Sequence, residues 1–155
     1  MRFPDKLNVQ LVKRNGEKLH LENVVFVIKL KAPQKNDYYL GPFFSNKGGE
    51  CKISEKVLKI SAEAVIQSGL MDYVNYELCS GIATIQILTV DEIEKMLKAR
   101  SVWGIIGKEA ELYVSKEHLL GWLKKSANHS VISKPIQVDL TKPPSSIELV
   151  INNVS

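Results

Sequence analysis

Residues 7–30 have the sequence LNVQLVKRNGEKLHLENVVFVIKL, and this stretch decides the fold. Over residues 7–11 apolar and polar side chains alternate, which is the period of a half-buried β-strand. Asn15-Gly16 then predicts a tight turn, because both residues tolerate positive φ. We expect a second strand over residues 19–30, so the chain opens with β structure.

The second of these strands carries a row of apolar residues on one face. They are Val24, Phe26, Ile28 and Leu30. The strand is long, and the polar pair Glu22-Asn23 interrupts it. This interruption predicts a bend or a bulge within the strand.

Shorter strands follow at intervals along the chain. They are predicted at residues 38–40, 51–53, 82–88, 111–114, 136–140 and 147–151. We expect Gly41-Pro42 to break the first of them, since proline has no backbone N–H to donate.

Three helices are predicted, over residues 54–68, 90–100 and 116–125. Ser54 is a candidate N-cap of the first, because its hydroxyl can accept a bond from an unpaired backbone N–H. Thr89 and Glu92 have the spacing of a capping box at the second. The first helix is expected to turn one apolar face to the core, made of Val57, Leu58, Ser61, Ala62, Val65 and Ile66.

The order of these elements predicts one domain over residues 1–155, mainly β with helical insertions. A regular alternation of strand and helix, which would indicate a doubly wound parallel sheet, is missing. We therefore expect an α+β fold built on an antiparallel β-sandwich with about three helices.

A family resemblance rests on the turns of the first third. The Asn15-Gly16 turn between two strands is followed by Gly41-Pro42-Phe43-Phe44 and by the turn SNKGGE at residues 45–50. This pattern resembles the start of transthyretin-like domains, the β-sandwich group that includes carboxypeptidase regulatory-like and collagen-adhesin B-type repeats. The resemblance implies a sandwich of seven or eight strands, to which the helices would be additions.

The same family contains enzymes that hydrolyse 5-hydroxyisourate and end in a Tyr-Arg-Gly-Ser motif. Residues 150–155 of this chain are VINNVS instead. We therefore do not expect that activity.

Charge is unevenly distributed along the chain, whose net charge is +4. Residues 1–53 hold 10 Lys and Arg against 5 Asp and Glu, and the remainder holds 11 against 12. Weak nucleic-acid binding through the basic N-terminal portion is one alternative function, although its lysines are scattered rather than clustered with aromatic residues. The first residues lack the apolar run of a signal peptide, so we expect a soluble, cytoplasmic protein without a membrane span.

The histidines and cysteines lack the spacing of a metal site, and we expect neither a metal nor a cofactor. The histidines are His20, His118 and His129, and the cysteines are Cys51 and Cys79. Both cysteines are expected to be free thiols. A small hydrolase with a site formed around these residues is a second alternative function.

The apolar segment VWGIIG at residues 102–107 is the best candidate for a partner-binding surface. We expect any such site to involve Trp103, Ile105 and Ile106, with Trp122 nearby, because tryptophan is enriched at binding hot spots. The favoured function is a non-catalytic protein-interaction module with an unidentified protein partner. By analogy, it would be a bacterial accessory or immunity-type binder.

Overall fold

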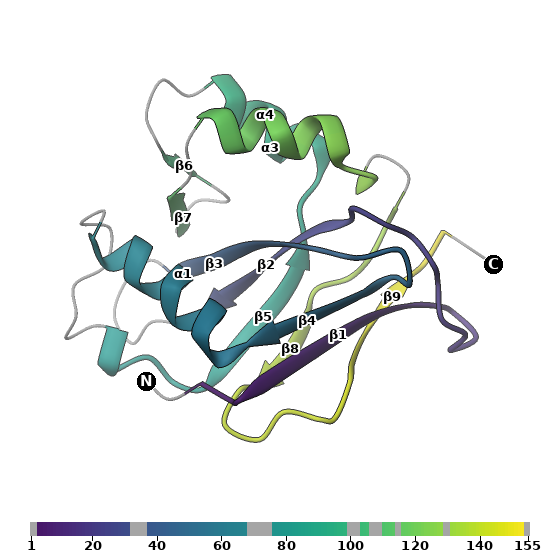
Figure 1. The fold of residues 1–155 in the computed structure, drawn as a ribbon, viewed down its shortest axis with the longest axis horizontal. Coiled ribbons are helices and arrows are strands. Elements are labelled where there is room, and N and C mark those ends of the chain that lie inside the picture. Colours follow the sequence, from purple (N-terminus) through teal and green to yellow (C-terminus); the bar gives the residue numbers. More distant parts are fainter. Residues whose placement is uncertain are drawn as a thin grey trace.

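The computed structural model describes residues 3–31, 37–67, 76–98, 103–105, 110–113, 116–128 and 131–153. These form two β-sheets and three helices in an α+β fold that is mainly β, as the sequence predicts (Figure 1). The smaller sheet has the order β4 (Glu50–Ser54), β1 (Lys6–Lys13), β9 (Ile147–Ile151). The larger sheet has the order β6 (Trp103–Ile105), β7 (Ala110–Tyr113), β3 (Asp37–Phe44), β2 (Val25–Leu30), β5 (Ile82–Ile87), β8 (Ile136–Asp139). Pairing is antiparallel except between β1 and β9 and between β3 and β7.

The turn at Asn15-Gly16 does not lead into a hairpin of two long strands. β1 and β2 belong to different sheets, and β2 begins only at Val25. The predicted start of that strand at residue 19 is therefore wrong. The predicted interruption at Glu22-Asn23 is therefore not a bend within a strand: it lies before β2, where Asn23 has φ of 62° and the chain passes from one sheet to the other.

Ser45 stabilises this crossing between the sheets. Its buried hydroxyl donates to the carbonyl of Leu21 at 2.7 Å and accepts from the N–H of Val24 at 3.0 Å. The backbone N–H of Asn23 in turn donates to the carbonyl of Ser45 at 2.9 Å. These bonds satisfy backbone N–H and C=O groups of the crossing segment, which no neighbouring strand bonds.

Both faces of β2 are buried. Phe26, Ile28 and Leu30, with Val24 before them, lie in the main core, which both sheets and the first helix share. The predicted apolar face is thereby confirmed. Val25 and Val27 point to the opposite side, where a second cluster forms under two helices. The continuous apolar run is typical of a strand covered on both faces.

The helices lie in two places. α1 (Glu55–Gln67) lies against β3 and β4, whereas α3 (Val90–Lys98) and α4 (Lys116–Lys125) pack together over the second cluster (Figure 1). The Thr89 hydroxyl accepts from Glu92 N–H at 3.1 Å, and the Glu92 carboxylate accepts from Thr89 N–H at 2.8 Å. The predicted capping box is therefore confirmed.

Asn128 joins the end of α4 to the larger sheet. Its Oδ1 accepts from the N–H of Val25 at 2.8 Å, and its Nδ2 donates to the carbonyls of Val25, at 2.9 Å, and Leu88. The side chain is only 4% exposed, so its amide would cost free energy here without these bonds. Asn128 thus fixes the position of the α3–α4 layer relative to β2.

β3 does not stop at Gly41-Pro42, contrary to expectation. It continues to Phe44, and β2 pairs Phe26 with Phe43 and Ile28 with Leu40. Two residues of β3 therefore lie opposite one residue of β2. This β-bulge accommodates Pro42 within the strand. Gly41 N–H donates instead to the Ser61 hydroxyl of α1, at 2.9 Å.

Candidate functional site

Trp122, one of the four predicted partner-binding residues, lies in the core. It is 4% exposed and makes an edge-to-face contact with Phe44 of β3, with ring centroids 6.4 Å apart and planes at 73°. Its cluster also contains Leu88 and Ile93. As a buried residue it anchors α4 on the sheet rather than offering a contact surface.

The other three predicted residues belong to the segment around β6. For Trp103 and Ile105 the structure describes the backbone, which forms β6. This strand lies at an edge of the larger sheet and pairs Trp103 with Tyr113. The predicted loop is therefore partly a strand. Ile106 lies outside the described residues. A partner-binding role for Trp103, Ile105 and Ile106 stays a prediction, which Trp103→Ala would test.

The three histidines differ in what the structure says of them. His118 is in α4, and His129 lies outside the described residues. His20 is exposed and lines an open pocket of about 540 Å³ together with Glu22 and Glu50. Imidazole and carboxylate side chains are the groups that general acid–base chemistry uses, and both kinds line this pocket.

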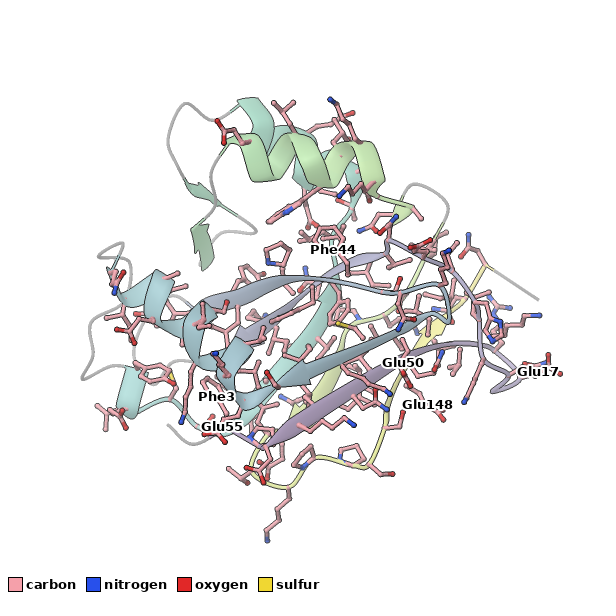
Figure 2. The ribbon with its side chains drawn as sticks, viewed as in Figure 1. Phe3, Glu17, Phe44, Glu50, Glu55 and Glu148 are labelled. Carbon is pink, nitrogen blue, oxygen red and sulfur yellow. The ribbon has the colours of Figure 1, made fainter. Side chains whose placement is uncertain are left out.

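Gln10, which also lines this pocket, has a structural role. Gln10 is 5% exposed, and its Nε2 faces three backbone carbonyls, those of Leu11, Gly48 and Gly49, at 2.9, 3.1 and 3.2 Å. In the sheet it lies opposite Glu50 of β4 and Glu148 of β9, the strands on either side of β1 (Figure 2). Gln10 therefore ties the turn before β4 to β1.

Neither cysteine has the surroundings of a reactive thiol. Cys79 is buried, and no disulfide joins it to Cys51 among the described residues. The pKa of Cys51 is raised to about 11, mainly by burial and with a smaller contribution from the nearby Glu50 carboxylate, against the lowering effect of a hydrogen bond with the Phe44 backbone. Nucleophilic catalysis needs a lowered thiol pKa, which is the opposite shift.

We expect Cys51 to hold about a hundredfold less thiolate at pH 8 than a thiol of pKa 9.0, because its pKa is raised to about 11. The measurement is site-resolved alkylation of the folded protein between pH 7 and pH 11. Its rate should reach half its maximum only near pH 11, whereas the rate of the unfolded chain should be half-maximal near pH 9.0. A half-maximal rate near pH 9 in the folded protein would contradict the raised pKa, whatever the absolute rate.

An open groove runs along the outer side of α1. It has a volume of about 780 Å³ and is lined by Asp5 and by residues between Ser54 and Gln67. Ser54 caps the helix, with its hydroxyl 3.3 Å from the N–H of Val57, and the N–H of Glu55 donates to the Asp5 carbonyl at 3.1 Å. Figure 2 shows Glu55 next to Phe3, where a second cavity of about 450 Å³ adjoins this end of the helix.

α1 buries only one narrow face. Leu58, Ala62 and Val65 lie in the core, whereas Val57 and Ile60 are 45% and 59% exposed. The expected place of Val57 on the inner face is therefore wrong, because that face is centred on Leu58 and Ala62. The exposed apolar residues have helical spacing, which is the signal in the sequence that could have indicated this surface.

No group of three or more His, Cys, Asp or Glu side chains among the described residues could hold a metal ion. No helix in that part of the chain is both long and apolar enough to cross a bilayer. Comparisons with protein-family models, with curated proteins and with solved structures found no match to this chain.

Proposed function

We propose that this chain is a non-catalytic protein-interaction module that binds its partner along the outer side of α1. The observation that carries the proposal is the exposure of Ile60, which lines the groove of about 780 Å³, with the exposed Val57 one turn before it on the same helix. Apolar side chains grouped on a surface and edged by charges are typical of protein interfaces. Here the edge is formed by charged residues of both signs, such as Lys56 and Glu63.

We also propose a transthyretin-like β-sandwich as the scaffold of this surface. Without β6 and β7, seven strands remain in two sheets that share one core, which supports the proposal. The helices are then additions to the sandwich. A cytoplasmic location and a bacterial accessory or immunity-type role belong to the same proposal, the latter by analogy with stand-alone binders.

The proposal is tested by placing a photo-crosslinking amino acid at Ile60 and irradiating cells that make the protein. We expect an adduct with another protein chain, because a group at this position reaches directly into the interface. Ile132 is the matched control, since it is also an isoleucine and is 64% exposed away from α1. Adducts at both positions in equal yield, or at neither, would contradict the proposal.

A hydrolytic site at the His20 pocket is the second candidate function. It is favoured by one observation, that His20 shares a pocket with Glu22 and Glu50. Hydrolysis of nitrophenyl esters and phosphodiesters at neutral pH should then exceed the buffer rate and be lost in His20→Gln. Equal rates for both proteins would exclude this activity toward these substrates.

A further inference from the structure

We propose that the partner of this surface is a second copy of the chain, with the two α1 helices packed antiparallel about a two-fold axis. The inference rests on the proposed function above, because it uses the same side of α1. It adds the identity of the partner and the register of the contact.

The apolar spacing on the outer side of α1 suits a helix pair. Val57, Ile60 and Ala64 follow one another at intervals of three and four residues, which is the seam spacing of a coiled coil, and the polar Gln67 takes the next seam position at the end of the helix. With the axis at Ile60, each Ile60 meets its equivalent in the second copy. Val57 then packs against the small side chain of the second copy's Ala64.

The charges on this side are complementary to themselves. Lys56 and Glu63 each come directly before a seam residue. The antiparallel register places Lys56 of one copy beside Glu63 of the other, and the two-fold axis repeats this pair, so the dimer contains two such pairs. A parallel register would leave Lys56 of one copy and Glu63 of the other seven residues apart along the axis, so these pairs would not form. The charges thus favour the antiparallel arrangement.

Lys56 and Glu63 are available for such pairs. Their side chains have no ion-pair or hydrogen-bond partner in the described part of the chain. Lys59, the other lysine of α1, is held by Glu55 of its own helix at 2.5 Å. The contact between copies would therefore pair two exposed charges that have no partner among the described residues.

The length of α1 sets the expected strength of the dimer. Thirteen helical residues span about 20 Å, so one helix pair buries less than the roughly 1,200–2,000 Å² of a standard specific interface. We therefore expect a reversible dimer that forms as concentration rises, rather than an obligate one.

Sedimentation equilibrium of the purified full chain over a wide concentration range tests the inference. We expect a monomer–dimer equilibrium that Lys56→Glu or Glu63→Lys alone weakens by about tenfold or more, since each sets two like-charge pairs across the axis. The double variant Lys56→Glu/Glu63→Lys restores opposite charges and should return the dissociation constant to near the wild-type value. Because a misfolded chain would not recover, this rescue separates a lost contact from lost folding.

Lys125→Glu on α4 is the charge control, since it reverses an exposed lysine away from α1 and should leave association unchanged. A protein that stays monomeric, single variants that associate like the wild type, or a double variant without rescue would each overturn the inference. A monomer that nevertheless forms a specific adduct at Ile60 with a different protein leaves the proposed function standing and removes only the second copy as partner. A monomer without that adduct removes both.

Discussion

Replacing Gly49 with alanine is expected to cost about 4 kcal/mol or more of unfolding free energy, or to prevent folding. A Cβ at this position would lie 1.8 Å from the Leu19 carbonyl oxygen, and Gly49 has φ of +72°. The obstructing atom belongs to backbone, and the N–H of Leu19 is held by the Leu11 carbonyl at 2.9 Å. The clash therefore cannot be relieved by rotating a side chain.

Gly16→Ala is the matched control for this variant. Gly16 has φ of +88°, but a Cβ there would have no atom within 4 Å. Its loss should be limited to the conformational cost of an alanine at positive φ, about 1–2 kcal/mol. Urea unfolding followed by circular dichroism measures both variants. Equal losses would show that backbone conformation, and not the approach of Leu19, requires Gly49.

Trp122→Ala is expected to lower the unfolding free energy by about 3–5 kcal/mol, as large-to-small core substitutions do. The indole fills the second cluster, which attaches the α3–α4 layer to the sheet, and its edge contact with Phe44 would be lost. Urea unfolding gives the size of the loss. Near-ultraviolet circular dichroism shows whether the remaining aromatic residues keep their packing.

Leu120→Ala on the same helix is the control, because Leu120 is 44% exposed. Its loss should stay below about 1 kcal/mol. The opposite pattern, in which Trp122→Ala keeps its stability but weakens partner binding, would return Trp122 to the partner-binding residues predicted from the sequence.

The local elements could be predicted from the sequence because both partners of each signal lie within a few residues. Thr89 and Glu92 are three positions apart, and their reciprocal bonds form as expected. Gly16 has the positive φ that its turn requires. The spacing of two residues between Phe26 and Ile28 likewise predicted that both face the core, since a strand turns every second side chain to one face.

Only the tertiary structure decided which of these elements meet. Asn128 bonds to Val25 across 103 positions, and β1 pairs in parallel with β9, the last strand. No local pattern contains such partners, because topology brings them together. The same reason explains which side of α1 is buried. Its sequence has apolar residues on more than one side, and the position of the sheet beneath it determines which of these sides packs in the core. The sequence by itself thus determined the helices, caps and most strands, whereas packing determined that Trp122 is buried and Ile60 is exposed.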